Sequence, residues 1–429
     1  MPHLDISVLN DIGPLLLLIV DCPRNLLHNP SYTLYRNRYK KINRYFLNNK
    51  KKDNPMISSV VISGVGLWTP AYSISNEELV DSYNAWAEQF NAKNFDAIEK
   101  GQIEAKPLSS AAFIEKASGI KSRYIYSKEG ALDINRMRPI LEVRNDEQVS
   151  HQAEMAIAAA KKALEAANKK ASDIDMVIVS CAYTQRSYPA IAIEVQAALG
   201  IEGFGFDMLV ACSAATFGLQ RAVDAIKAGS SKGVLVINPE LTSPQVNYMD
   251  RDSHFIFGDV ATAVVVESSE TCQSAHSFDV LSSKCITSYS NNIRSNFGYT
   301  TRVTDEDPYS ADMLFHQNGR KVFKEVCPMA ADHIESHLKS HGIQVSELKR
   351  WWLHQANINM NLLISKRLLG RDATLEEAPV VLDEYANTAS AGSIIAFAKH
   401  HKDLAAGDIG VICSFGAGYS IGSLILRKR

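Results

Sequence analysis

The sequence opens without the features of a secretory or membrane segment. Leu15–Val20 is apolar but only six residues long, whereas a membrane-spanning helix needs about 20. His3, Asp5 and Asp11 precede it, so the positive region that begins a signal peptide is missing. We therefore expect neither secretion nor a membrane partner.

Cysteine is scarce and irregularly spaced. The 429 residues contain seven cysteines, with no CxxC pair among them. An odd, scattered set in a chain of this length indicates reduced thiols and a cytoplasmic setting rather than a disulfide framework. No Cys/His spacing suggests a zinc site. The seven are Cys22, Cys181, Cys212, Cys272, Cys285, Cys327 and Cys413.

Most of the chain also lacks an excess of positive charge. The formal net charge is −2, but residues 1–55 hold nine Lys or Arg against four Asp, so the remainder is near −7. An acidic body argues against nucleic acid as the main partner. The apolar share of 46% and the charged share of 21% are ordinary for a globular enzyme with a sizeable core.

Residues 1–55 differ in character from the rest of the chain. Tyr32–Lys52 is rich in Asn, Lys, Tyr, Ile and Arg, and it has no steady hydrophobic period. It could be a basic arm. We interpret residues 1–55 instead as a non-native or disordered extension, translated from too early a start, with Met56 as the natural first residue.

Cys212 lies where a strand is expected to turn into a helix. Phe206–Val210 is an apolar run typical of a buried strand, and apolar residues then recur at helical spacing until Gly229. Unpaired backbone N–H groups and the positive end of the helix dipole at such a junction favour a thiolate over a thiol. Cys212 is therefore a candidate nucleophile, although a cysteine in this context alone is more often a small buried hydrophobe.

Two further polar residues follow expected strands far downstream. His354 ends the apolar part of WWLHQAN, and Asn387 lies in EYANTASAGS, where a small-residue helix begins. Taken singly, His354 would be a structural histidine at a strand end with its ring nitrogens hydrogen-bonded, and Asn387 would be a helix N-cap. Together with Cys212 they resemble the Cys-His-Asn triad of the thiolase-fold condensing enzymes. The HQAN and ANTASAG segments are similar to the HQAN and GNTSAAS motifs of β-ketoacyl-acyl carrier protein synthase III, and this resemblance covers nearly all of residues 56–429.

The resemblance implies an α/β protein with the thiolase fold. Such a fold has two pseudo-repeated βαβαβαββ halves, which form a five-layered α-β-α-β-α core. We place the first half at residues 56–270 and the second at residues 271–429.

The sequence supports a repeat independently of the resemblance. Sliding the chain along itself so that Ser180 meets His354 also brings Cys212 to within one position of Asn387. In a single doubly wound domain, a functional Cys and Asn at matching points of two repeats would be a coincidence. The shared offset therefore favours two packed halves in which both sheets carry helices.

The implied reaction is a decarboxylative Claisen condensation of an acyl thioester with malonyl-acyl carrier protein in fatty acid biosynthesis. By resemblance the enzyme is a homodimeric acyltransferase without metal or other cofactor. Cys212 would hold the acyl group, and His354 and Asn387 would donate hydrogen bonds to the carbonyl of the second thioester as malonyl loses CO2. The oxyanion site would be the backbone N–H groups of Cys212 and of Ala417 in the turn Phe415–Gly418.

Other functions remain open at this point. The same triad could serve a different condensation or acyl transfer, such as head-to-head joining of two acyl thioesters or a natural-product acyltransferase step. A protein of another class, a non-catalytic partner that binds carrier protein, is less compatible with an intact triad.

By resemblance, Phe113, Tyr188 and Gly418 would contact substrate. Phe113 and Ala117 stand where the family has a Trp and an Arg that hold coenzyme A, which predicts weaker coenzyme A binding. Tyr188 matches an aromatic residue that reaches across the dimer to limit the acyl pocket. Each buried CH2 contributes about 0.8 kcal/mol. We therefore expect a medium-chain acyl group, carried on coenzyme A or on carrier protein, to offset the weaker nucleotide binding.

The acidic carrier protein requires a basic docking site. Lys366 and Arg367 follow the HQAN motif on one expected helix and match a lysine pair of the family, and Lys324 matches another family lysine. An ordinary solvated helix face explains the same residues equally well.

Overall fold

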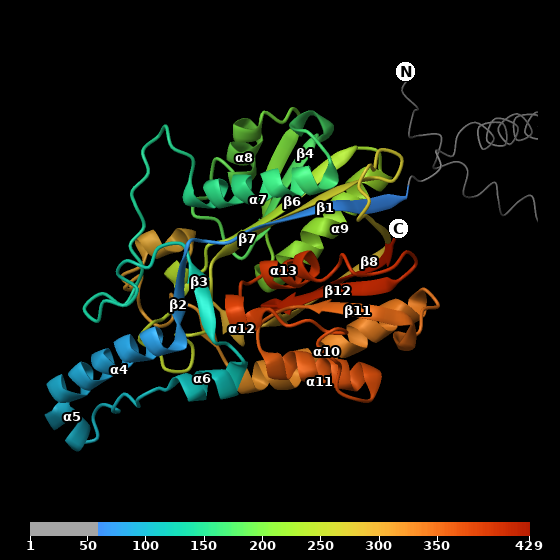
Figure 1. The fold of residues 1–429 in the computed structure, drawn as a ribbon. Coiled ribbons are helices and arrows are strands. Elements are labelled where there is room, and N and C mark those ends of the chain that lie inside the picture. The colour runs from blue at the N-terminus through green and yellow to red at the C-terminus, as the bar shows by residue number, and fades with distance from the viewer. Residues whose placement is uncertain (1–58) are drawn as a thin grey trace, which may run out of the picture. The chain divides into compact units, whose positions relative to one another are not determined.

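The computed structural model describes residues 59–429 (Figure 1). Their main element is a nine-stranded sheet in the order β11-β12-β13-β8-β1-β7-β6-β4-β5. The contact between β1 and β8, which joins the two halves, consists of the pairs Val61–Asp279 and Ile62–Phe278. Residues 1–55, which we interpreted as an extension, lie outside the described residues, so that interpretation stays a prediction.

The first half follows the predicted βαβαβαββ order. Its first long helix is N-capped by Ser150, whose hydroxyl accepts a hydrogen bond from Ala153 N–H, and it ends at Asn168 in the left-handed region. The elements are β1 (Val60–Trp68), α7 (His151–Ala167), β4 (Met176–Cys181), α8 (Ile191–Leu199), β5 (Phe204–Leu209), α9 (Ala214–Lys227), β6 (Gly233–Glu240) and β7 (Val260–Ser268).

The second half repeats this order at nearly the offset found in the sequence, since β11 follows β4 and β12 follows β6 at almost equal distances along the chain. One strand of the repeat is missing, between α11 and α13. Pro379 has no N–H for a strand ladder, and the side chain of Gln355 binds this segment instead, accepting from Val381 N–H (3.0 Å) and donating to Pro379 O (3.3 Å). The elements are β8 (Phe278–Ser290), α10 (Gly319–Ser340), β11 (Leu348–Leu353), α11 (Ile358–Leu369), α13 (Ala391–Lys399), β12 (Ile409–Gly416) and β13 (Gly418–Lys428).

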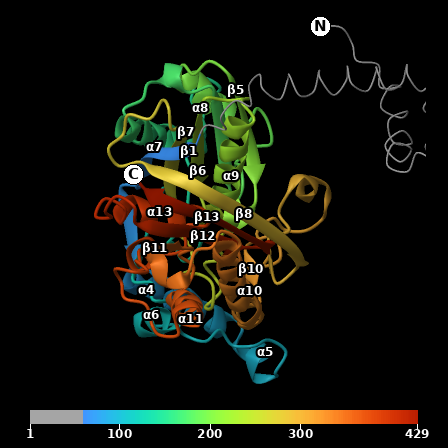
Figure 2. The same cartoon turned by 90° about the vertical axis from the view of Figure 1, so that its right-hand side faces the viewer.

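Five layers stack in the predicted α-β-α-β-α order (Figures 1 and 2). Helices α7 and α8 cover one outer face, α10 and α11 cover the other, and α9 and α13 lie between the two sets of strands. The middle core combines Leu219 of α9 with Ile394 of α13. Close approach of α7 to β1 requires glycine, because a Cβ on Gly66 would lie 2.1 Å from Ala159 O.

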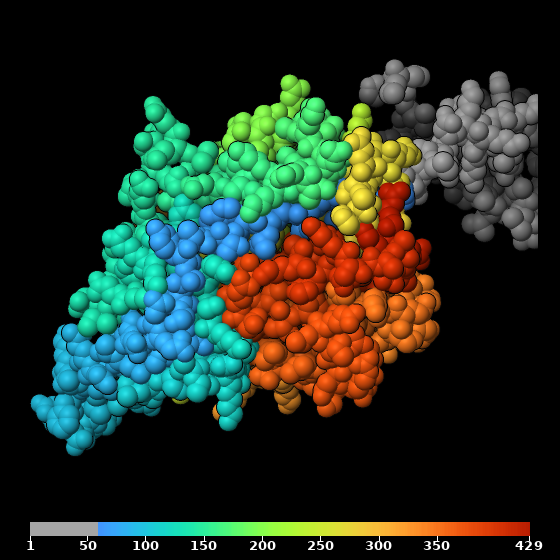
Figure 3. Space-filling view, in the orientation of Figure 1, coloured from blue at the N-terminus to red at the C-terminus, as the bar shows by residue number. Residues whose placement is uncertain are grey.

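Long connections supply the remaining elements. The connection between β1 and α7 forms a small two-stranded sheet and helices that pack on Phe255 and Phe257 in a separate apolar core, and in Figure 3 its blue and cyan part projects at one end of the described residues. The helical part of this connection forms three pieces, with an irregular stretch from 100 to 110 between the second and the third. No helix within residues 59–429 is long and apolar enough to cross a membrane. The elements are β2 (Tyr72–Ser75), α4 (Asn76–Lys93), α5 (Phe95–Glu99), α6 (Ala111–Ser118), β3 (Ser122–Ile125), β9 (Ile293–Arg294), β10 (His316–Gln317), α12 (Leu382–Tyr385) and the 3-10 turns η2 (Ala171–Asp173), η3 (Ala211–Ser213), η4 (Ser243–Gln245), η5 (Tyr299–Val303) and η6 (Val345–Glu347).

Candidate active site

Cys212 lies in η3, between the end of β5 and the start of α9. Ala211 has a φ of 45°, in the left-handed region that residues other than glycine rarely occupy, so the chain turns sharply as it enters the helix. Ser213 ties this turn to β13 by donating a hydrogen bond to Ser420 O (2.8 Å). The strand-to-helix junction predicted from the sequence is therefore present.

The charge state of Cys212 differs from the one expected. Its side chain is partly accessible, yet loss of solvation, followed by the negative charge of Glu240, raises the pKa of the thiol to about 12, against a lowering effect of its own backbone N–H. The expectation that the helix N-terminus makes a thiolate is wrong here, because desolvation outweighs the donors at the junction. The resting group is a thiol.

His354 immediately follows β11 and is 2% exposed. Its backbone N–H donates to Cys413 O (2.8 Å), and its ring meets the Phe415 ring edge-on, with centroids 5.1 Å apart. Burial lowers the pKa of the imidazole to about 3. His354 is therefore neutral and keeps one N–H, which suits a hydrogen-bond donor to a carbonyl oxygen. Its Nδ1 is buried and has no hydrogen-bond partner within residues 59–429.

Asn387 lies shortly before α13, in a turn (residues 386–390) that we call the Asn387 turn. Its backbone N–H donates to Ile256 O (2.9 Å), and its carbonyl accepts from Gly258 N–H (3.1 Å). Its side-chain Oδ1 accepts from Ala389 N–H (2.9 Å), which fixes the amide with Nδ2 as the remaining donor. Ser390, rather than Asn387, is the residue at the N-cap of α13, so the helix-cap interpretation of Asn387 is wrong.

The end of β12 connects the three candidate residues. A Cβ on Gly416 would lie 2.6 Å from Cys212 Cβ, so this strand end packs directly on Cys212. His354 contacts Cys413 and Phe415 of the same strand. The hydroxyls of Ser414 and Ser393 lie 2.9 Å apart, which ties β12 to the helix that follows the Asn387 turn. These contacts place Cys212 and His354 at the end of β12, and they tie the helix that follows the Asn387 turn to the same strand.

The turn between β12 and β13 can present backbone donors beside Cys212. Ala417 does not adopt a positive φ, so an alanine is accommodated where the family has glycine. Ser420 Oγ donates to Ala417 O (2.8 Å) and also lies 3.0 Å from Ser213 Oγ, which links the turn to the Cys212 junction. Gly418 has a φ of 133° and is exposed, and its contact with substrate stays a prediction.

Phe113, on α6, has a partner that the sequence did not reveal. The guanidinium of Arg251 lies 3.7 Å from the centre of the Phe113 ring, and Arg251 Nε donates to Leu108 O (2.9 Å). Ala117 O accepts hydrogen bonds from the side chains of Asn357 (2.9 Å) and Asn359 (3.5 Å). At the position of the family's arginine this chain has Ala117, but Arg251 lies against the Phe113 ring. The long separation of Arg251 from Phe113 in the sequence hid it, because no local pattern links a helix to a distant loop.

Strand β5 and the segment before α8 form an exposed edge. The sequence predicted a buried strand, but β5 is the last strand of the sheet and Leu209 is 56% exposed. Tyr188, which precedes Pro189, is 81% exposed, and Ile193 and Phe204 are also exposed apolar residues. The apolar run of β5 therefore lies on a surface of the single chain rather than in its core.

The three residues predicted for carrier docking are all exposed. Two of them have acidic partners, since Lys366 lies 3.5 Å from Asp372 and Arg367 lies 3.0 Å from Asp332. Lys324 has no ion-pair partner within residues 59–429. The local positive charge is therefore smaller than the sequence suggests.

Glu240, the last residue of β6, is a buried acid near Cys212 that sequence reasoning missed. It is 1% exposed and accepts hydrogen bonds from Ala182 N–H and Ser390 N–H, both 3.1 Å. A single acid at the end of an apolar strand, GVLVINPE, was the available signal.

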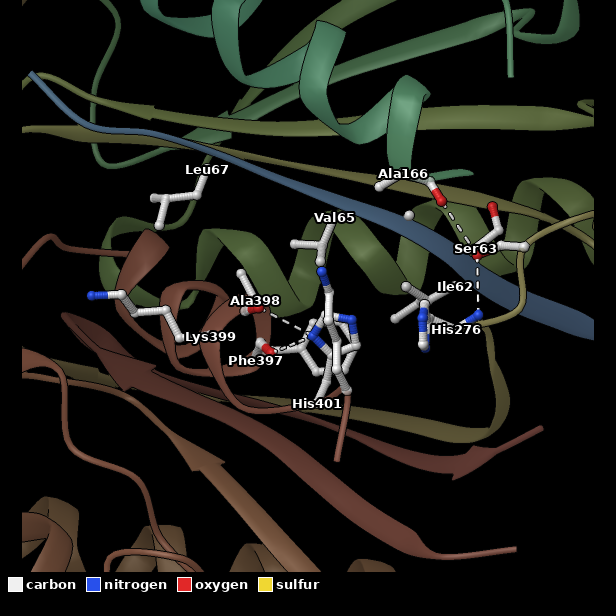
Figure 4. A pocket seen from close by; sticks show the side chains of 13 residues that line it. Ile62, Ser63, Val65, Leu67, Ala166, His276, Phe397, Ala398, Lys399 and His401 are labelled. Atoms are coloured by element: carbon white, nitrogen blue, oxygen red, sulfur yellow. Dashed lines mark hydrogen bonds between the residues drawn. The ribbon is translucent and has the colours of Figure 1, made fainter. Parts of the chain in front are cut away.

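A cavity elsewhere in the described residues does not belong to this site. It opens between α7, β1 and α13, and its lining includes Val65, Phe397 and His401, with Lys399 at one end (Figure 4). Its lining does not include Cys212, His354 or Asn387.

Comparison with known proteins gives two family matches. The model described as 3-oxoacyl-[acyl-carrier-protein (ACP)] synthase III matches residues 206–288, and its C-terminal counterpart matches residues 338–428. The first match contains Cys212, and the second contains His354 and Asn387. A β-ketodecanoyl-[acyl-carrier-protein] synthase of Pseudomonas aeruginosa is 57% identical over 350 residues, which cover 82% of this chain and 100% of that protein.

Solved structures confirm the predicted fold. A 3-oxoacyl-[acyl-carrier-protein] synthase III from Aquifex aeolicus superposes with a TM-score of 0.67 at 25% identity, covering 86% of this chain and 99% of that one. OleA from Xanthomonas campestris, solved with lauric acid and lauroyl-CoA, superposes with a TM-score of 0.65 at 17% identity, covering 87% and 100%. At that identity the second likeness shows the fold alone.

Proposed function

The chain belongs to the β-ketoacyl-[acyl-carrier-protein] synthase III family, the condensing enzymes of fatty acid biosynthesis, and on this basis we propose that it joins a medium-chain acyl group to malonyl-acyl carrier protein. The proposal is supported by the contacts of Cys212 and His354 with the end of β12, and by the bond from this strand to the helix after the Asn387 turn, in a chain 57% identical to a β-ketodecanoyl synthase.

In the first half-reaction, Cys212 would take the acyl group. Its Sγ attacks the thioester carbonyl, the bond between that carbonyl and the carrier sulfur breaks, and the thiol proton leaves on the released carrier thiol. Because burial raises the pKa of Cys212, the proton is lost as the sulfur attacks rather than beforehand. Backbone N–H groups of Cys212 and Ala417 would stabilise the oxyanion.

In the second half-reaction, His354 and Asn387 would act on malonyl-acyl carrier protein. Loss of CO2 leaves a carbanion beside the thioester carbonyl, and the neutral imidazole N–H and the amide Nδ2 can donate to the enolate oxygen that results. The lowered pKa of His354 supports this role, because an imidazolium would give up its proton to the enolate. The carbanion then attacks the acyl carbonyl on Cys212, whose sulfur leaves as the new carbon–carbon bond forms and takes a proton from solvent to restore the thiol.

We infer the acyl donor from the β-ketodecanoyl synthase relative and from the surroundings of Phe113. A β-ketodecanoyl product has ten carbons, of which malonyl supplies two after loss of CO2, so an acyl group of eight carbons fits. The contact between Arg251 and Phe113 provides a cation and a ring edge for a nucleotide base, which would partly offset the weaker coenzyme A binding predicted from Phe113 and Ala117. We therefore propose that coenzyme A and carrier protein both deliver the donor, the latter docking near Lys324, Lys366 and Arg367.

A homodimer through β5 would account for the exposed edge. Pairing of two β5 strands would satisfy their free backbone groups and cover Leu209 and Phe204. Tyr188 would then reach toward the acyl pocket of the partner and limit its length.

A series of acyl donors tests the proposal. Wild-type protein is incubated with acyl-CoA and acyl-carrier donors of two to twelve carbons, and intact mass reports the acyl group retained on the protein. Loading should rise steeply toward eight carbons, since six additional CH2 groups contribute up to about 5 kcal/mol. Preferred loading of acetyl would reject the medium-chain assignment, and absence of loading by any donor would reject the condensing function.

A further inference from the structure

The carboxylate of Glu240 connects the two halves of the molecule beside the candidate active site. Its Oε2 accepts from Ala182 N–H, directly after β4 of the first half. Its Oε1 accepts from both the N–H and the Oγ of Ser390, at the start of α13 in the second half. Three donors therefore converge on one side chain that is almost completely buried.

Ser390 also belongs to the turn that orients Asn387. Its neighbour Ala389 has a φ of 47° and donates the N–H that fixes Asn387 Oδ1. Ala386, on the other side of Asn387, has a φ of 56°. Two left-handed residues other than glycine are costly unless the surroundings hold them. Ile256 and Gly258 hold one side of the turn, and Glu240 holds the other through Ser390.

The charge of Glu240 has no cationic partner within residues 59–429. Burial, and to a smaller extent the charge of Asp259, raise the pKa of this carboxyl to about 7, against the lowering effect of the bonds from Ser390 and Ala182. The other titratable groups whose charges it meets are Cys181, Tyr183 and Cys212. None of these is a cation near neutral pH, so none of them offsets the negative charge of the Glu240 carboxylate.

We propose that Glu240 is a positioning residue for the condensation half-reaction, holding the Asn387 turn against the end of β4 so that the Asn387 amide faces the incoming malonyl thioester. This inference rests on the proposed function. The ionised carboxylate accepts from all three donors with its two oxygens. Protonation turns one acceptor site into an O–H donor and removes the negative charge, so the hydrogen bonds to the turn weaken and the turn is held less firmly.

Two consequences distinguish this role from a purely structural one. Condensation should fall as the pH drops through the neutral range, because the protonated form of Glu240 holds the turn less well, whereas loading of Cys212 should not show that loss. Removal of the negative charge should also make Cys212 easier to ionise, because Glu240 is the acid that raises its pKa.

The test uses Glu240→Gln in the full chain, with Glu267→Gln as control. Glu267 is another buried glutamate at the end of a neighbouring strand, but it pairs with Lys169 (2.7 Å) away from Cys212. Protein preloaded with octanoyl is mixed with malonyl-acyl carrier protein between pH 5.5 and 8.5, and single-turnover product formation is followed. Alkylation of unloaded Cys212 by iodoacetamide is measured over the same pH range.

Wild type should show an acid limb near pH 7 in condensation. Glu240→Gln should load at least as fast as wild type, condense about tenfold more slowly at pH 8, lose the acid limb and alkylate faster than wild type at equal pH. The control Glu267→Gln should match wild type in loading, in condensation rate, in the acid limb and in alkylation. If Glu240→Gln fails to fold, Ser390→Ala, which removes one donor and keeps the acid, should slow condensation in the same direction.

Several results would overturn the inference. One is that Glu240→Gln condenses at the wild-type rate and with the wild-type pH profile; where that variant does not fold, the same result for Ser390→Ala counts. Another is that wild type shows no acid limb in condensation. If wild type does not load octanoyl at all, the proposed function itself fails instead.

Discussion

Replacement of Gly416 by alanine should disable acyl loading while leaving the fold in place. Gly416 ends β12 and faces Cys212, and an added Cβ would lie 2.6 Å from Cys212 Cβ, 3.2 Å from its N and 3.3 Å from its Cα. Carbon atoms in good contact are about 3.5 to 4.0 Å apart, so one partner must move by roughly 1 Å. Both are held, because Gly416 pairs with Ser420 in the sheet and Ser213 Oγ donates to Ser420 O.

A displacement of about 1 Å at a reacting atom lowers rates by about 100-fold. Overpacking of this kind costs about 1–3 kcal/mol of stability, so the variant should still fold. The assay is the rate of octanoyl loading by intact mass, with thermal unfolding measured on the same samples. Gly319→Ala is the control, since a Cβ there would meet only Gln317 Nε2 at 3.9 Å. Loading of Gly416→Ala within threefold of wild type would refute the packing argument.

Two further outcomes concern the donor and the response to pH. Arg251→Ala should raise KM for octanoyl-CoA about two- to fivefold, because an exposed cation–π contact contributes about 0.5–1 kcal/mol, and it should leave KM for octanoyl-carrier protein unchanged. Arg302→Ala, which removes a similar contact on Tyr299, is the control. Equal effects of Arg251→Ala on both donors would contradict the assignment. Burial lowers the pKa of His333 and His337 from 6.5 to about 4 and about 3, so their stabilisation is complete above pH 6.5 and is lost as the pH falls toward the folded values. The free energy of unfolding in urea should therefore drop between pH 7 and pH 5, on the order of 1–2 kcal/mol per histidine, with a smaller drop in His337→Gln; an unchanged value would show that these histidines are not buried in the neutral form.

Much of the fold was accessible from the sequence, because the repeat leaves a nearly constant offset in the apolar pattern. The offset pairs Ser180 with His354, and the structure places Ser180 in β4 and His354 directly after β11, the matching strands of the two halves. The missing strand of the second half shows the limit of such an argument. A repeat predicts equal elements, whereas Pro379 and the side chain of Gln355 decide locally whether a ladder can form.

The site was less accessible, because burial and distant contacts have no sequence period. The helix N-terminus at Cys212 suggested a thiolate, but the enclosure that raises its pKa is contributed by other strands. Arg251 and Glu240 lie far along the chain from the residues they contact. The apolar run of β5 is that of a core strand, which predicted burial, and only the sheet order shows that β5 is an edge.

The central claim, that Cys212 holds the acyl group while His354 and Asn387 act on malonyl, is tested most directly by intact mass before and after addition of malonyl-acyl carrier protein. Wild type should load octanoyl and then release it as product. His354→Ala and Asn387→Ala should load but keep the acyl group, and Cys212→Ala should not load. Loading of folded Cys212→Ala, or failure of folded His354→Ala or Asn387→Ala to load, would contradict this division of roles.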